Sequence, residues 1–150
     1  MFLDALLLLS DAQAVSVDAV STNTIDLGNP TVKNRIGSGE PMAILITVDV
    51  SADGTTGDET YAFEVIQSAN ANLSSADVLV RRAFLAGQHT QLVAGTRLVL
   101  GVPPGTPTKR YLGVNYDVGG TTPSITVTAA LMPQSMAEES VTHYAKGYTV

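Results

Sequence analysis

Cysteine and tryptophan are both absent from this 150-residue sequence. Without cysteine the chain has no disulfides, no thiolate nucleophile and no cysteine-ligated zinc, and its redox compartment stays undetermined. Aromatic residues make up only 5% of the chain. That scarcity counts against a glycan-binding module, because such a shallow site would need clustered, exposed aromatic side chains.

Charged residues are also scarce, at 15% of the chain against about 25% in a typical soluble domain. The mean hydropathy is +0.20. A soluble chain with so little charge either hides extra surface against a partner or against copies of itself, or covers its outer faces with Thr, Ser and Asn. The net charge of −6 at pH 7 disfavours binding to nucleic acid or to an anionic membrane.

One segment imitates a calcium-binding loop. The sequence from Asp49 to Gly54 has oxygen-bearing side chains and a glycine where such a loop begins, but its twelfth position is Thr60 instead of a bidentate Glu. We interpret the segment as a hairpin loop solvated by Asp53, Asp58 and Glu59, and we expect no metal and no cofactor there.

No catalytic motif stands out elsewhere. His89 and His143 are isolated and lie near no acidic cluster in the sequence. A Ser-His-Asp arrangement stays open in principle, because triads assemble in space. With no nucleophile elbow in view, we expect that the protein is not an enzyme.

Apolar and polar residues alternate along many short segments that are separated by turn residues. A period of two is typical of half-buried antiparallel strands, and helical periodicity is almost absent. The pattern predicts a single all-β domain, a jelly-roll-type antiparallel β-sandwich. The predicted strands are Ala14–Val20, Met42–Val50, Tyr61–Ile66, Val78–Leu85, Arg97–Val102, Leu112–Val118 and Ile125–Leu131.

The last two of these strands are joined by a glycine turn. Gly119 and Gly120 supply the positive φ angles that a tight turn needs. We therefore expect Leu112–Val118 and Ile125–Leu131 to pair as an antiparallel hairpin. The segment builds a surface, since it contains neither a nucleophile beside a base nor a metal-ligand cluster.

The first 14 residues resemble a secretory signal in their apolar core and Ala-x-Ala ending. No Lys or Arg precedes the apolar run, Asp4 interrupts it, and it is shorter than the roughly 20 residues of a membrane span. Two interpretations remain. The segment is either a retained arm that packs on a neighbouring surface through Phe2, Leu6 and Leu7, or a first core strand or helix of the same domain.

The alternating pattern ends after Pro133. The segment that follows carries Tyr144, Lys146 and Tyr148 and is too long for simple fraying. We predict one domain, residues 1–150, with a β-sandwich at 15–132 between an N-terminal arm, 1–14, and a C-terminal arm, 133–150.

Two adjacent arginines, Arg81 and Arg82, stand inside a predicted strand. Neighbouring strand residues point to opposite faces. An outward arginine would be a donor to a partner's carboxylate, or it would pair with an acidic residue of its own chain. The sequence is compatible with both interpretations.

Several strings, in order along the chain, carry a resemblance to a known family. They are residues 2–14, 21–28, 57–61, 68–75, 103–111 and 144–150. Together they resemble capsid cement (decoration) proteins of tailed bacteriophages, the kind known from the short-tailed Bordetella phage. None of the strings is a chemical signature, so the resemblance depends on their number and order.

The resemblance implies a structural virion protein with a jelly-roll fold and no catalytic residues. It implies a homo-oligomer, with a dimer expected, that is made in the bacterial host cytoplasm and lies on the outer surface of an icosahedral capsid. The implied partner is a major capsid protein of the HK97 type. The other reading is a virion-surface β-sandwich adhesin or glycan-binding module. The candidate partner-binding residues are Phe2, Leu6, Leu7, Arg81, Arg82, Tyr144, Lys146 and Tyr148.

Overall fold

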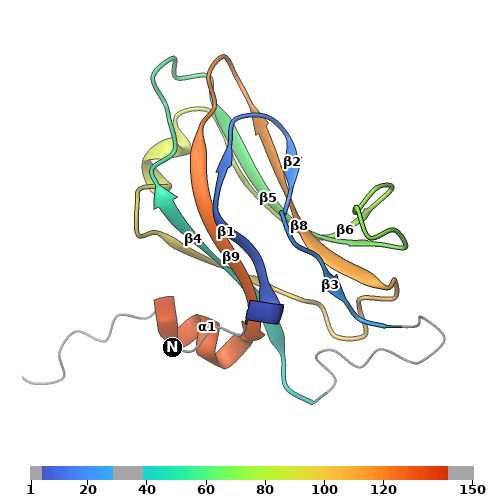
Figure 1. Cartoon of the computed structure of the whole chain (residues 1–150). Coiled ribbons are helices and arrows are strands. Elements are labelled where there is room, and N and C mark those ends of the chain that lie inside the picture. The colour runs from blue at the N-terminus through green and yellow to red at the C-terminus, as the bar shows by residue number, and fades with distance from the viewer. Residues whose placement is uncertain (1–4, 29–38, 142–150) are drawn as a thin grey trace, which may run out of the picture.

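The computed structural model describes residues 5–28 and 39–141. Within these ranges nine strands form two antiparallel sheets that face each other as a sandwich (Figure 1). The prediction of an all-β antiparallel sandwich is therefore confirmed. Sheet A contains, in spatial order, β1 (Leu8–Val15), β9 (Ile125–Pro133), β4 (Met42–Val50) and β7 (Arg97–Gly101). Sheet B contains β2 (Ala19–Val20), β8 (Tyr111–Gly119), β5 (Thr60–Ser68) and β6 (Asp77–Phe84), and β3 (Ile25–Asp26) also pairs with β8.

Most connections carry the chain from one sheet to the other. β1 is followed by β2 in sheet B, β4 by β5 in sheet B, β6 by β7 in sheet A, and β8 by β9 in sheet A. Among the nine described strands, β5 and β6 alone are both consecutive in sequence and hydrogen-bonded to each other. This alternation is compatible with a jelly roll, and the jelly-roll assignment within the sandwich class stays a prediction.

The core lies between the inner faces of the sheets, where the alternating apolar residues meet. Tyr61, Phe63 and Tyr116 are at most 1% exposed, and the Phe63 ring meets the rings of Tyr116 and Phe84 edge-on, with both centroid distances 6.1 Å. Such edge-on pairs add to the apolar burial. The predicted inward residues that are buried are Ile44, Ile46, Val48, Tyr61, Phe63, Val65, Leu112, Val114, Tyr116, Ile125, Val127, Ala129 and Leu131.

The predicted hairpin of β8 and β9 is wrong. β8 pairs with β5, and β9 pairs with β1 and β4, so the two strands lie in different sheets. Each strand still buries one alternating face, because the two sheets turn their inner faces toward the same core. Gly120 has φ +102°, and a Cβ there would lie 2.7 Å from the Cα of Glu59. The glycine is needed for a close crossing between sheets.

The N-terminal arm predicted at 1–14 is corrected over most of its length. Ala5–Leu7 form a short 3-10 helix, η1, and the chain then enters β1, an edge strand of sheet A. Leu9 and Val15 on β1 are 0% and 1% exposed. The alternative reading, a first core strand of the same domain, is the correct one for this segment. The predicted strand Ala14–Val20 is split, because the chain crosses to sheet B between β1 and β2.

The sequence pattern of β1 is obscured by irregularities in the strand. Its register against β9 shifts between Leu8 and Ser10 and again between Ser10 and Gln13, and Ala12 has φ +44°. Each bulge changes which face the following residues occupy. A period of two is therefore lost along β1 even though the strand is part of the core.

The predicted C-terminal arm begins with a helix that covers its own subunit. Pro133 ends β9, and α1 (Gln134–Val141) follows it and packs against β7, β4 and β9 of sheet A (Figure 1). Ala137 is fully buried there, in a second apolar cluster on the outer face of sheet A. The boundary at 133 and the description of this part as an arm are corrected. The other members of that cluster are Ala43, Leu45, Ala130 and Met132.

Candidate partner-binding surfaces

An ion-pair network lies on the outer face of sheet B. Arg81 on β6 donates through Nη1 to Oε1 of Glu64 on β5, and through Nη2 to Oδ2 of Asp117 on β8 at 2.8 Å. Asn115 donates its amide Nδ2 to the other Glu64 oxygen, Oε2, at 2.8 Å. The network joins three neighbouring strands across the sheet. Glu64 is only 5% exposed, so these donors supply the hydrogen bonds that its carboxylate would otherwise form with water.

The network distinguishes the two interpretations of Arg81, a donor to a partner's carboxylate or a pair with an acidic residue of its own chain. Hydrogen bonds to Asp117 and to Glu64 raise the pKa of the Arg81 guanidinium. The reading as an intramolecular pair therefore holds for this residue. Its side chain is nevertheless half exposed, at 50%, so the guanidinium is held in one place on an open face.

A hollow of about 150 Å³ adjoins the network. Its floor contains Ala62 and Ala83, which face each other across β5 and β6, and their short side chains leave the space. Arg81 and Asp117 supply charge to the lining, and Leu85, 66% exposed, supplies an apolar wall. The remaining lining residues are Thr60, Tyr61 and Phe84.

Arg82 lies on the opposite face of the same strand. It is directly across from Phe63, whose side chain is in the core, so Arg82 projects at the inner side of the sheet edge. Its guanidinium carbon lies 5.4 Å from the centroid of the Phe84 ring, a favourable cation–π distance. Arg82 is exposed and forms no ion pair within 5–28 and 39–141.

The N-terminal candidates lie on the other side of the sandwich. Leu6 is 82% exposed, whereas Leu7 is partly buried against the main core. They precede β1, which contacts β8 across the sandwich, while β6 contacts β7. The structure therefore does not bring these leucines together with Arg81 and Arg82. Phe2, Tyr144, Lys146 and Tyr148 lie outside the described residues. All eight residues stay predictions as partner contacts.

The loop that imitates a calcium site is filled with internal hydrogen bonds. Glu59 is 0% exposed, and its carboxylate accepts from the Thr56 amide and hydroxyl and from the Gly57 amide. Asp58 accepts from the hydroxyl of Thr56 at 2.6 Å and from the amide and hydroxyl of Thr121 at 3.1 and 2.7 Å. The expectation that Glu59 solvates the loop is wrong, since backbone and hydroxyl donors replace water around it.

These donors also hold the loop carboxyls in their charged form. Hydrogen bonds from the hydroxyls of Thr56 and Thr121 lower the pKa of Asp58 to about 2. The Thr56 hydroxyl lowers the pKa of Glu59, and the Thr55 hydroxyl lowers that of Asp53. No group of three or more His, Cys, Asp or Glu residues within 5–28 and 39–141 is placed to hold a metal ion. The independence from calcium stays a prediction.

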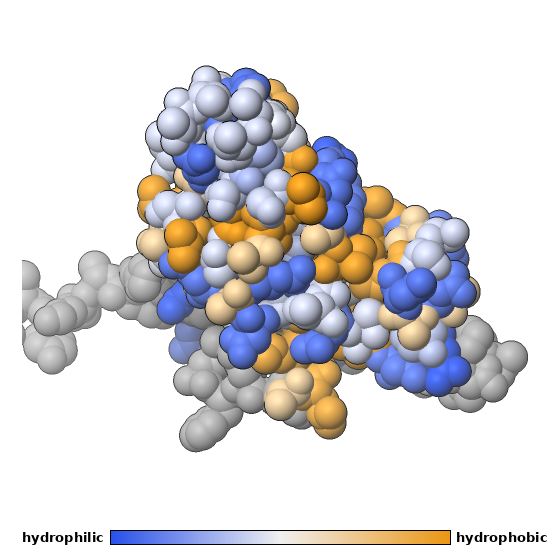
Figure 2. Space-filling model, turned by 45° about the horizontal axis from the view of Figure 1, so that its top comes forward, coloured by the Kyte–Doolittle hydropathy of each residue, from blue (hydrophilic) through white to orange (hydrophobic). Residues whose placement is uncertain are grey.

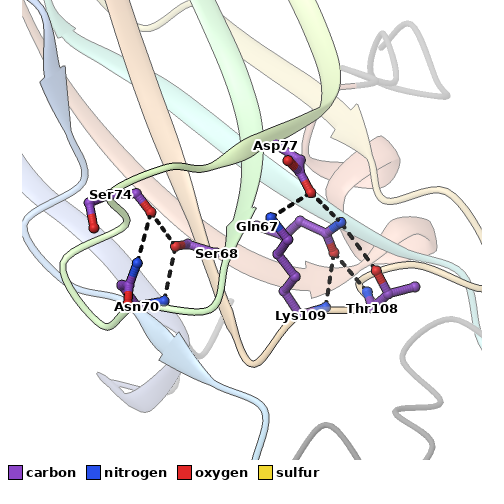
Figure 3. A network of polar contacts seen from close by, with 7 residues as sticks. All are labelled: Gln67, Ser68, Asn70, Ser74, Asp77, Thr108 and Lys109. Carbon is purple, nitrogen blue, oxygen red and sulfur yellow. Dashed lines mark hydrogen bonds and ion pairs between the residues drawn. The ribbon is translucent and has the colours of Figure 1, made fainter.

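A second polar network fixes the loops at the opposite end of sheet B (Figure 3). The Gln67 carbonyl accepts from the amides of Thr108 and Lys109 at 2.7 and 3.2 Å, and Lys109 Nζ lies 2.7 Å from Asp77. The Pro-rich loop before β8 is thereby tied to β5 and β6. Ser68 ties down the neighbouring loop by donating to the carbonyl of Ser74 at 2.6 Å. Both loops present a fixed surface.

Apolar side chains reach the surface at scattered positions. Figure 2 shows them as separate hydrophobic patches among polar residues on the face that it displays. Sequence reasoning missed most of them, because single apolar residues at strand ends and in loops carry no periodic signal. The large exposed apolar residues are Leu6, Val17, Val20, Val50, Val78, Leu85, Val93 and Met136.

Within the described part of the chain, no helix is long and apolar enough to cross a membrane.

Comparison with known families gives one match that covers most of the chain. The model of the Bbp16 family matches residues 9–131, which reach from β1 into β9. The chain belongs to the Bbp16 family. Bbp16 proteins are a family of Bordetella phage proteins, which makes this chain a phage-related protein and suggests a structural one associated with the virion.

The other comparisons add little to the Bbp16 assignment. No curated protein matches the chain. Among solved structures, the chain is similar to one titled "Crystal structure of PirA", with 9% identity and a TM-score of 0.42 over 82% of this chain and 95% of that one. A likeness of that size carries no argument about function.

Proposed function

We propose that this Bbp16-family protein is a capsid cement protein. It binds the outside of an icosahedral phage capsid and holds neighbouring capsomers of the major capsid protein together. The observation that carries the proposal is the family match over residues 9–131, because it places nearly the whole sandwich in a phage family. The resemblance of the chain to capsid cement proteins points to the same role.

The physical argument concerns the joints between capsomers. Packed DNA presses outward on a filled head, and a protein that bridges two capsomers must be detached before they separate. When one contact of such a bridge opens, it closes again as an intramolecular event, so modest contacts add up to high avidity. The proposed partners are a major capsid protein of the HK97 type and a second copy of this chain.

The surface of the sandwich supports a binding role. Charged residues are few, and the outer face of sheet B carries fixed polar groups, the Arg81 network and the hollow beside it. Loops at both ends of sheet B are held by hydrogen bonds. A pre-ordered surface loses little conformational entropy when it binds.

The test compares phage heads with and without this protein. Heads assembled without it should release their DNA at a lower temperature, or after milder osmotic shock, than complete heads. Adding the purified protein back should restore the resistance. If depleted heads withstand heat as well as complete heads do, the proposed function is wrong.

A further inference from the structure

Among residues 5–28 and 39–141, the outer edge of β6 pairs with no strand. β6 is the last strand of sheet B and pairs through its backbone with β5. Within 5–28 and 39–141, no backbone hydrogen bond joins Val78–Phe84 to any other strand or loop. A strand edge of this kind presents a row of N–H and C=O groups that another strand can use.

The other edges of the sandwich are less suited to pairing. β1 has two register shifts and a residue with positive φ, and such bulges twist an edge away from a partner. β2 and β3 have two residues each, and β7 has five and lies against α1. β6 has eight residues, and its register against β5 shifts once, between Val78 and Val80. The run Val80–Phe84 beyond that shift is regular, and it carries Arg82 and Ala83.

The side chains beside this edge place a cation on its inner face and a hollow on its outer face. On the inner face Arg82 is exposed and has no ion pair with a described residue. On the outer face Ala83 opens the hollow, whose lining includes Ala62 and Leu85. Because neighbouring strand residues point to opposite faces, an added strand would meet both features with two successive side chains.

We propose that the edge of β6 accepts an extended segment of another protein by strand addition. One side chain of that segment is a carboxylate that faces Arg82, and the next is an apolar side chain that enters the hollow over Ala62 and Ala83. In such binding the backbone supplies affinity and the side-chain pockets supply specificity. The identification of the capsid shell as the source of this segment rests on the proposed function.

Charge argues for a foreign strand over a second copy of β6. Antiparallel pairing of β6 with itself, centred near Arg82, would bring Arg82 of both copies to one seam, and like charges across a strand pair are destabilising. The chain as a whole has a net charge of −6, and Arg82 is the β6 cation that has no ion pair with a described residue. An acidic strand is the complementary partner.

The direct test uses the full-length protein and a synthetic peptide of alternating Val and Thr with one Glu next to a Val. Amide hydrogen exchange should slow across Val78–Phe84 when the peptide is added. A peptide with Gln in place of Glu should bind about fivefold more weakly, the upper range for an exposed ion pair. Arg82→Gln should remove that difference, whereas Arg97→Gln on β7 should keep it.

Two results would overturn the inference. The first is exchange in β6 that does not change with the peptide. The second is slow exchange in β6 that grows with protein concentration and without peptide, which would show that a second copy occupies the edge.

Binding to depleted heads tests the source of the strand separately. Arg82→Glu and Ala83→Leu, which fills the hollow, should each lower binding to heads while the variants melt like the original protein. If both variants bind heads normally but the peptide still slows exchange in β6, the edge accepts a strand and the shell is not its source. If the original protein does not bind heads at all, the proposed function fails and the peptide result still decides the inference.

Discussion

One end of the outer face of sheet A is apolar and lies under α1, whereas the outer face of sheet B carries a buried carboxylate held by an ion-pair network. On sheet A, Leu45 and Met132 are 4% exposed beneath the fully buried Ala137. On sheet B, Glu64 is buried to a similar extent, at 5% exposed, but its partners Arg81 and Asp117 remain accessible. The apolar end of one face is closed by α1, and the network on the other face is ordered while Arg81 and Asp117 stay accessible among the described residues.

The difference shows two ways to stabilise the outer face of a β-sheet in a sandwich. An apolar face must be covered, because exposed apolar area costs free energy. A face with paired charges keeps its order without a cover, and it stays available to a partner. Disrupting the two faces should therefore lower stability through different interactions.

The largest effect is expected where the apolar cover is broken. Ala137→Asp would place a carboxylate among Ala43, Leu45 and Ala130 with no donor close by in the cluster. The free energy of unfolding should fall by about 3 kcal/mol, measured by urea denaturation. Met136→Asp, at a position 41% exposed on the same helix, is the control and should change little. Equal stability of the two variants would show that α1 does not close sheet A.

A smaller effect is expected on the open face. Arg81→Met removes both donors that Arg81 supplies and leaves Glu64 with the amide of Asn115. Because an under-satisfied carboxylate is costly, we expect a loss of about 1–2 kcal/mol. The neighbouring Arg82→Met loses only the contact with Phe84 and should cost about 0.5 kcal/mol. The order of the two losses in urea denaturation is the test, and a larger loss for Arg82→Met would contradict it.

Acid should also lower the free energy of unfolding, through Asp58 in the loop that joins the two sheets. The pKa of Asp58 is lowered to about 2 in the folded protein, against about 3.9 in an unfolded chain. The stability that this carboxylate contributes is present above pH about 4 and is lost as the pH falls toward about 2. Asp58→Asn should therefore flatten the dependence of unfolding free energy on pH in this window. An unchanged slope would contradict the role of the Thr56 and Thr121 hydroxyls, and Asp11→Asn on β1 is the control.

Calcium should have no effect on thermal stability. Thr60 stands where a calcium loop needs a bidentate Glu, and in the structure Asp53, Asp58 and Glu59 accept hydrogen bonds from Thr55, Thr56 and Gly57 of the same loop. Thermal melting with calcium and with a chelator should give the same midpoint. A midpoint raised by several degrees in calcium would restore this loop as a metal site.

Local alternation predicted the strands that matter most for the core. Met42–Val50 was predicted with the bounds that the structure has, and Tyr61–Ile66 falls within β5. β8 and β9 were also predicted within one or two residues. These strands bury the apolar residues of their inner faces over most of their length, so a period of two can be recognised in their sequences. The bulged β1 lacks that period and was predicted with the wrong bounds.

The candidate site was less accessible to sequence reasoning. The adjacent arginines could be singled out, and their opposite faces followed from strand geometry. Their partners Glu64 and Asp117 are 17 and 36 residues away from Arg81, and no local pattern connects them. The hollow depends on two alanines that become neighbours only when β5 and β6 pair.

The sequence by itself determined the β class, the inner faces of the long strands, the low charge and the opposite orientations of Arg81 and Arg82. These properties depend on residue type and on a spacing of two residues. Tertiary structure alone decided that β8 and β9 lie in different sheets, that α1 covers sheet A, and that Glu59 and Glu64 are buried. An alternating strand buries the same face against any suitable partner, so its pairing and the burial of its polar residues depend on contacts distant in the sequence.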